Sequence, residues 1–238
     1  MRFNALTNKG NKRSSNEDDF HIKEDINFFM VADGMGGHAA GEVASQTAVN
    51  SAADFNFDLS DPLESLSQLT YKINQEIINK SQQNTDYSGM GTTFAAVIIQ
   101  NNILYYVNLG DSRIYLYNKK EESLRKISKD HSLVADLLRK GKITEEEAFN
   151  HPKKNIVTQA LGLDNDLDLD KGQIEISAAD YILLCTDGLT DMIRKNEIEA
   201  VFKEYYKPEK IAEQLLQDAL ASGGLDNITL IVAGSNEK

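Results

Sequence analysis

Residues Val31–Ser45 read VADGMGGHAAGEVAS, and this stretch organises the chain around it. Before it, the apolar run Asn27–Ala32 predicts a buried strand that ends at Asp33. Glycines then follow at positions 34, 36, 37 and 41, so the backbone there can approach a ligand closely. From Glu42 onward, small and apolar residues return at helical spacing. The sequence therefore predicts a strand, a glycine loop and a helix, with an acidic residue at the end of the strand.

The composition predicts one folded domain over residues 1–238, in the cytoplasm. The chain is 41% hydrophobic and has only 3 prolines, which is typical of a globular protein. We expect no membrane insertion and no signal peptide, because no apolar run is long enough for either. A single cysteine excludes an intrachain disulfide and a cysteine-based zinc site. The net charge of −12 argues against binding to nucleic acid or anionic lipid, and it indicates either simple solubility or carboxylates that hold cations.

The rest of the chain predicts an α+β fold. Helices are expected at about 42–53, 63–83, 132–140, 144–149, 196–204 and 208–221. Strands are expected from about 20, and at 92–100, 103–109, 114–117, 124–127, 173–176, 181–186 and 228–233. Asn101-Asn102 predicts a two-residue hairpin turn, and the central strands form an antiparallel meander. Thr144 and Glu147 predict a capping box within an exposed insertion at about 129–165.

Five aspartates stand at corresponding positions, directly before or after apolar runs: Asp18, Asp33, Asp111, Asp187 and Asp226. Strands of shared sheets would bring these carboxylates together, where a hard divalent cation would offset their mutual repulsion. Oxygen ligands without a Cys or His cluster favour Mg²⁺ or Mn²⁺ over Zn²⁺. Each aspartate alone is also explained as a turn or capping residue, but their recurrence favours a metal centre. The run Asp164–Asp170 lacks the glycine and glutamate of a calcium loop and predicts a solvated loop.

Seven motifs follow one another along the chain: RSSNED at 13–18, VADGMGGHAAGEVAS at 31–45, GMGTT at 89–93, NLGDSRIY at 108–115, KDHS at 129–132, LLCTDGL at 183–189 and GGLDNIT at 223–229. In this order they resemble the PPM family, the metal-dependent protein serine/threonine phosphatases of type 2C, in its bacterial form. The resemblance implies a sandwich of two antiparallel β-sheets flanked by helices on both faces (αββα), with a small helical flap at about 129–165. It also implies a signalling hydrolase that acts on phosphoproteins and opposes a serine/threonine kinase. A monomer is the default expectation, since the sequence leaves the oligomeric state open.

The resemblance assigns metal-binding roles residue by residue. It implies that Asp33 bridges two Mg²⁺ or Mn²⁺ ions and that Gly34 offers its carbonyl oxygen to one of them. Asp187 and Asp226 are the implied ligands of the other ion. The implied reaction is in-line attack on phosphorus by a hydroxide that bridges the two ions, without a covalent phosphoenzyme.

Three further residues complete the implied site. Asp18 acts directly or through bound water, and Asp111 supports a third, weaker ion. Arg13 grips the substrate phosphate, since a planar guanidinium suits bidentate phosphate binding. Without the resemblance, Arg13 reads as a surface charge near the N-terminus.

The motifs do not identify the general acid that protonates the leaving group. Animal and plant members of the family carry a histidine directly after the Asp-Gly, where this chain has Met35. His38 is the candidate in this chain, although a loop hydrogen bond explains it equally well, and metal-bound water is a further option. Two competing functions are a catalytically weak phosphoprotein-binding module and a phosphatase of small phosphoesters. The presence of all five aspartates argues against the first.

Overall fold

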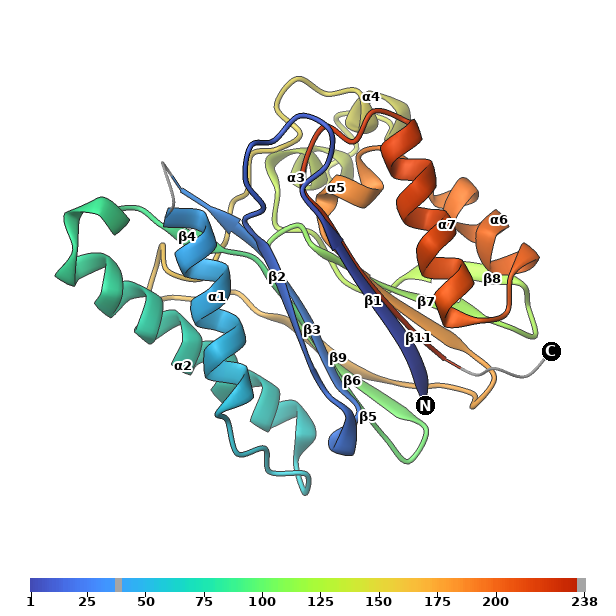
Figure 1. Cartoon of the computed structure of the whole chain (residues 1–238), viewed down its shortest axis with the longest axis horizontal. Helices are drawn as coiled ribbons and strands as arrows, with labels where there is room; N and C mark the ends of the chain where they lie inside the picture. The colour runs from blue at the N-terminus through green and yellow to red at the C-terminus, as the bar shows by residue number, and fades with distance from the viewer. Residues whose placement is uncertain (37–39, 235–238) are drawn as a thin grey trace.

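The computed structural model describes residues 1–36 and 40–234, and it contains two antiparallel β-sheets packed face to face (Figure 1). One sheet has the order β1-β11-β10-β7-β8, with bounds Arg2–Asn8, Ile228–Gly234, Tyr181–Cys185, Arg113–Asn118 and Ser123–Lys126. The other has the order β2-β3-β5-β6-β9, with bounds Asp18–Lys23, Phe28–Met35, Phe94–Gln100, Ile103–Leu109 and Asp170–Glu175. The short β4, Gly91–Thr92, pairs with the end of β3.

The space between the sheets is filled by alternate residues of their strands. Phe29 and Val31 of β3 face this layer, as do Ile182 and Leu184 of β10 and Ile231 of β11. Strand side chains alternate between the two faces of a sheet, so their neighbours point outward, towards the helices. Both faces are therefore buried, which explains why these strands are continuous apolar runs in the sequence.

Helices cover the outer face of each sheet (Figure 1). The β2-β3 sheet carries α1, Ala40–Ala53, and α2, Pro62–Gln83, while the β1-β11 sheet carries α6, Lys195–Glu204, and α7, Pro208–Ala221. One face of α1 consists of small residues such as Ala44, Ala48 and Ala52, all fully buried, so this helix can lie close to the sheet. Within the described part of the chain, no helix combines the length and apolar character needed to cross a membrane.

The predicted flap, residues 129–165, lies within the connection between β8 and β9. It contains α3, Leu133–Arg139, and α4, Glu145–Phe149. The predicted capping box is confirmed: the Thr144 hydroxyl accepts from the Glu147 N–H at 3.2 Å, and the Glu147 carboxylate accepts from the Thr144 N–H at 2.8 Å. Figure 1 shows both helices at one end of the sandwich, beside α5, Asp187–Thr190.

The predicted αββα sandwich is confirmed, and four local details differ from the expectation. The chain begins with β1, whose mixed polar and apolar residues gave no strand signal. The strand predicted to end at Asp33 continues to Met35, because β4 pairs with Gly34 and Met35. The strand predicted at 173–176 is β9, which begins at Asp170. Short single turns of 3-10 helix, not predicted, lie at Glu24–Ile26 and Thr85–Tyr87.

Candidate metal centre

A pocket of about 430 Å³ lies where β3 and β10 end and where β2, β7 and β11 begin. Six of the predicted site residues line it: Arg13, Asp33, Gly34, Asp111, Asp187 and Asp226. The seventh, Asp18, is the antiparallel partner of Asp33 in the β2–β3 pair, so its carboxylate lies on the same side of the sheet. His38, the candidate general acid, lies outside the described residues.

Two of the aspartates keep a carboxylate oxygen buried without a hydrogen-bond partner among the described residues. Asp18 is only 7% exposed; its Oδ2 accepts from the Thr186 hydroxyl at 2.9 Å, whereas its Oδ1 has no donor. The Oδ1 of Asp187 is likewise buried without a donor. An unpaired buried carboxylate oxygen costs free energy, and a hard cation is the ligand that best removes this cost. The donor set therefore fits a divalent metal ion.

The carboxylates also raise one another's pKa. Burial raises the pKa of Asp33 well above its usual value, and the nearby Asp18, Asp187 and Asp111 raise it further. Burial raises the pKa of Asp18 to about 7, and it raises the pKa of Asp111 to about 6 although Arg113 opposes this. The pKa of Asp187 is raised by burial and then by Asp111. The pocket thus favours additional positive charge.

Arg13 is the one basic side chain among the described residues that line this pocket. Its Nη2 donates to Asp226 Oδ2 at 2.6 Å, and about half of its side chain is exposed. In the described part of the chain, no three acidic, histidine or cysteine side chains converge closely enough to hold an ion by themselves. A metal ion here would need backbone or water oxygens in addition to the carboxylates.

Comparison with known proteins identifies the family. A family model described as Protein phosphatase 2C matches residues 8–222. The chain belongs to this family. A serine/threonine phosphatase, stp, from Listeria monocytogenes serotype 4b (strain F2365) is 38% identical over 241 residues, which cover 98% of this chain and 95% of the Listeria protein. The predicted type of enzyme, a PPM-type protein phosphatase and hydrolase, is confirmed.

Solved structures of phosphatases share the whole fold. The crystal structure of the Mycobacterium tuberculosis serine/threonine phosphatase PstP/Ppp aligns with a TM-score of 0.91 and 35% identity, over 99% of each chain. The catalytic domain of a phosphatase PstP in complex with two manganese ions aligns with a TM-score of 0.86 and 34% identity, over 97% of this chain and 96% of that one.

Two threonines of this phosphatase hold Asp33 by its backbone. The Asp33 N–H donates to the Thr93 hydroxyl at 2.9 Å, and the Thr92 hydroxyl donates to the Asp33 carbonyl at 2.9 Å. The Thr93 hydroxyl also bonds the Ser112 hydroxyl at 2.7 Å, next to Asp111. These residues thus join the backbones that carry two of the predicted metal-binding aspartates. The sequence alone did not reveal these roles, because the hydrogen bonds connect separate strands.

Asn227 was missed for the same reason. Its side chain accepts from the Glu17 N–H at 2.8 Å and donates to the carbonyls of Lys9 and Ser15 at 3.0 and 2.8 Å. The loop that carries Arg13 is therefore fastened to the loop that carries Asp226. The one signal for this role in the sequence was an asparagine directly after a predicted metal-binding aspartate, Asp226.

The glycines of the two Asp-Gly pairs are required by packing. A Cβ atom on Gly34 would lie 2.1 Å from the carbonyl oxygen of Gly41 at the start of α1. A Cβ atom on Gly188 would lie 1.9 Å from the carbonyl oxygen of Asn227. For Gly34 the sequence indicated a close approach to a ligand; the nearest neighbour of each of these two glycines is the backbone of the phosphatase itself.

Proposed function

We propose that the pocket is the active site at which this phosphatase hydrolyses phosphoserine and phosphothreonine in proteins. The observation that carries this assignment is the pair of buried carboxylate oxygens, on Asp18 and Asp187, that lack hydrogen-bond donors among the described residues of a pocket lined by aspartates. The manganese ions of the similar PstP structure support it.

We propose that at least two Mg²⁺ or Mn²⁺ ions bind here. Asp33 would contact both, the Gly34 carbonyl one of them, and Asp187 and Asp226 the other, with Asp18 acting directly or through water. Asp111 would serve a third, weaker ion; its position beside Asp187 in the pocket wall supports this. When bound, the ions would supply Lewis acidity, which lowers the pKa of water and neutralises charge on the phosphoryl group.

Arg13 is our proposed phosphate-binding residue. Its bond to Asp226 orients the guanidinium at the mouth of the pocket. A guanidinium has five N–H donors, so Arg13 can keep Asp226 and still present donors to phosphoryl oxygens. The planar fork would also fix the orientation of the phosphate, which favours in-line attack.

His38 stays our candidate general acid for the leaving alkoxide. A His38→Gln variant should reduce kcat for a phosphopeptide, whose leaving group needs a proton, more than for p-nitrophenyl phosphate, whose leaving group does not. Equal losses on the two substrates would instead favour a structural role for this histidine.

We further infer that residues 1–238 act as one phosphatase domain with a flap at about 129–165. The proposed partners are phosphoproteins that include a serine/threonine kinase, and the proposed form is a cytoplasmic monomer. The single cysteine, Cys185, is buried in β10, which agrees with a reducing compartment.

The test of the site is hydrolysis of a phosphothreonine peptide with Mn²⁺, with chelator, and in Asp33→Asn and Asp187→Asn variants. Turnover should require the metal and fall at least roughly 100-fold in each variant. Asp58→Asn is the matched control and should behave as wild type, because Asp58 is exposed between α1 and α2 and does not line the pocket. A folded wild-type protein without turnover would instead favour the phosphoprotein-binding module.

A further inference from the structure

A groove continues from the proposed active site beneath α3 and α4. It consists of two adjoining cavities of about 450 and 410 Å³, which share the lining residues Arg113, Tyr115, Glu145, Phe149, Thr190 and Lys195. The larger cavity also shares Asp111 and Asp187 with the metal pocket. We call these two cavities the under-flap groove. Because the wall is shared, a polypeptide that leaves the active site on this side enters the groove directly.

The two flap helices contribute most of the apolar side chains of the groove. Val134 and Leu138 of α3 line it, together with Ala148 and Phe149 of α4, and Leu138 is still 36% exposed. Phe149 is held by Arg194, a lining residue of the smaller cavity, whose guanidinium lies 4.4 Å from the ring centre and is paired with Glu146. These flap side chains offer apolar contact to a bound chain, although they do not by themselves select one.

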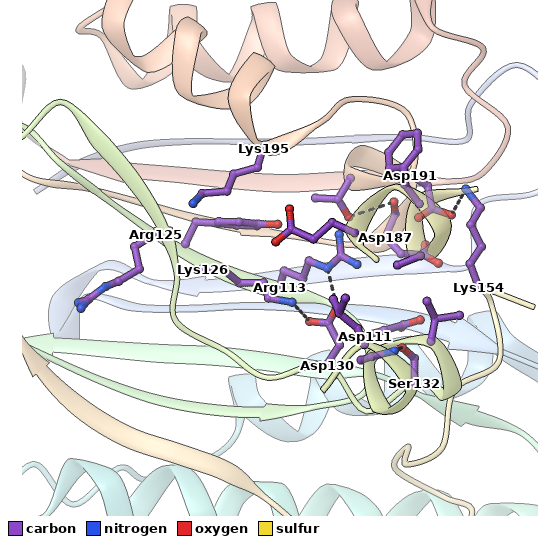
Figure 2. A pocket seen from close by; sticks show the side chains of 18 residues that line it. Asp111, Arg113, Arg125, Lys126, Asp130, Ser132, Lys154, Asp187, Asp191 and Lys195 are labelled. Atoms are coloured by element: carbon purple, nitrogen blue, oxygen red, sulfur yellow. Dashed lines mark hydrogen bonds and ion pairs between the residues drawn. The ribbon is translucent and has the colours of Figure 1, made fainter. Parts of the chain in front are cut away.

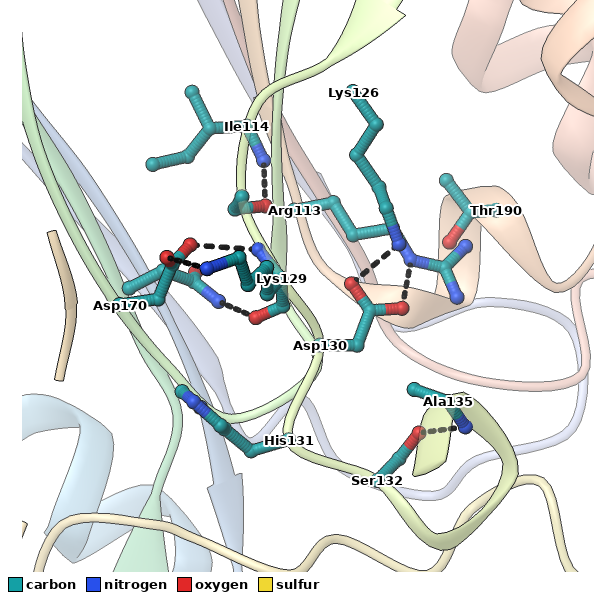
Figure 3. A network of polar contacts seen from close by, with 12 residues as sticks. Arg113, Ile114, Lys126, Lys129, Asp130, His131, Ser132, Ala135, Asp170 and Thr190 are labelled. Carbon is teal, nitrogen blue, oxygen red and sulfur yellow. Dashed lines mark hydrogen bonds and ion pairs between the residues drawn. The ribbon is translucent and has the colours of Figure 1, made fainter. Parts of the chain in front are cut away.

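Most cations of the groove are already neutralised. Asp130 accepts from Arg113 Nε at 2.9 Å and from Lys126 Nζ at 2.8 Å, as Figure 3 shows. Lys154 forms an ion pair with Asp191 at 2.9 Å. Because these side chains are already paired with carboxylates, they offer little net charge to attract a ligand.

Arg125 and Lys195 are different. Both side chains are exposed, and neither forms a side-chain hydrogen bond or an ion pair within residues 1–36 and 40–234. Lys195 interacts only through its charge with Glu199, whose pKa it helps to lower. Figure 2 shows them on the side of the cavity away from Lys154. Three carboxylates of the larger cavity have no ion pair: Asp111, Asp187 and Glu145. The first two also line the metal pocket, so Glu145 is the one unpaired carboxylate, among the described lining residues, that both groove cavities share. This end of the groove therefore offers two cationic side chains without ion-pair partners, against the one shared carboxylate Glu145, in a chain whose net charge is −12.

We propose that the under-flap groove binds the substrate segment on one side of the phosphorylated residue and selects acidic side chains there, through Arg125 and Lys195. This inference rests on the proposed function, since it makes the groove an extension of the active site. Exposed ion pairs are individually weak, so the groove should bias the choice among phosphoproteins without being essential for turnover.

The test is a scan of phosphothreonine peptides in which one Asp replaces Ala at each of the four positions before and after the phosphoresidue. In the wild type with Mn²⁺, Asp at positions on one side only should raise kcat/KM by roughly two- to fivefold. The Arg125→Ala/Lys195→Ala variant should lose that preference, and Arg125→Glu/Lys195→Glu should prefer Lys at the same positions. Glu145→Gln should strengthen the preference for Asp.

The control variant Lys120→Ala/Lys142→Ala removes the same charge from two exposed lysines outside the groove and should keep the preference. Equal kcat/KM for all peptides, or a preference that survives Arg125→Glu/Lys195→Glu, would overturn the groove proposal while leaving the active-site assignment intact. If the folded wild type with Mn²⁺ cleaves neither the peptides nor p-nitrophenyl phosphate, the proposed function fails, and this inference fails with it.

Discussion

Asn227 connects the two loops that carry Arg13 and Asp226, and it is 6% exposed. Asn227→Ala would leave one N–H and two carbonyls without their partner, which should lower the free energy of unfolding by roughly 2–4 kcal/mol. Because Arg13 would lose its support, KM for a phosphopeptide should rise more than kcat falls. Urea denaturation and steady-state kinetics measure both effects. A variant that is destabilised but has an unchanged KM would mean that Asn227 does not position Arg13.

Gly34 gives a second prediction for a single residue. In Gly34→Ala, the new methyl group would have to displace the Gly41 carbonyl, so β3 and α1 would move apart. We expect a loss of stability of roughly 3 kcal/mol or more, or failure to fold. Gly89→Asn is the control, because Gly89 has open space around it and asparagine tolerates its φ of +74°. Near-native melting of Gly34→Ala would contradict the close contact.

For single residues, the sequence predicted the site aspartates, which recur beside apolar runs. It did not predict the residues whose roles depend on hydrogen bonds to distant parts of the chain. The five aspartates stood out because each adjoins an apolar run, and all of them lie in or beside one pocket. Thr93 and Asn227 could not be recognised, since their roles come from hydrogen bonds to residues 60 and more than 200 positions away.

At the scale of secondary-structure elements, His131 ties the start of the flap to the turn between β6 and β7. The backbone N–H of His131 donates to the Gly110 carbonyl at 2.8 Å, and the ring Nδ1 accepts from the Gly110 backbone N–H at 3.1 Å. Burial lowers the pKa of His131, although Asp168 and Asp170 oppose this, so the neutral ring is the stable form at neutral pH. These two hydrogen bonds join the start of the flap to Gly110, the residue before Asp111.

His131 should therefore make stability depend on pH. A histidine with a lowered pKa contributes stability that is complete above about pH 6.5, its unfolded value, and is lost as the pH falls towards the folded value. His131→Asn, whose side-chain oxygen can also accept from Gly110, should remove that pH dependence while costing only about 1 kcal/mol at pH 7.5. Urea titrations at pH 5.5 and 7.5 compare the two proteins. An unchanged slope in the variant would exclude His131 as its source.

The elements themselves were largely predictable, and the exceptions share a cause. Helices with clear periodicity, such as α2 and α7, were predicted to within one residue of their observed bounds. The strand β1 was missed and the end of β3 was placed too early, because the partners that define both, β11 and β4, are remote in the sequence. Register against a remote strand is tertiary information that local patterns do not contain.

At the scale of the whole molecule, the αββα sandwich followed from the ordered motifs, whereas the strand order of each sheet did not. The β1-β11-β10-β7-β8 sheet places β1 beside β11, the first and last strands of the described residues, which brings Arg13 next to Asp226 across 213 positions. The same closure gathers carboxylates from both sheets in one pocket. Their mutual repulsion is therefore a property of the complete fold, and it should appear in the stability of the whole protein.

This repulsion predicts how the metal-free protein responds to pH. Asp18 and Asp111 have folded pKa values of about 7 and 6, above the usual value of 3.8, so the folded state holds protons that the unfolded state releases. In chelator, each should lower the free energy of unfolding by up to ~1.4 kcal/mol per unit as the pH rises from about 4 towards 6 or 7. Ions that bind only the folded state should reverse this loss at pH 7.5.

Urea denaturation with chelator and with Mn²⁺, at pH 5.0 and 7.5, measures both effects. The stabilisation by Mn²⁺ should be several kcal/mol larger at pH 7.5 than at pH 5.0, because protons and metal ions compete for the same carboxylates. Asp18→Asn keeps an acceptor for the Thr186 hydroxyl but removes one titrating group, so its metal-free pH slope should be shallower. A metal-free protein whose stability rises between pH 5.0 and 7.5, in the wild type and in Asp18→Asn alike, would show that these carboxylates do not control the balance.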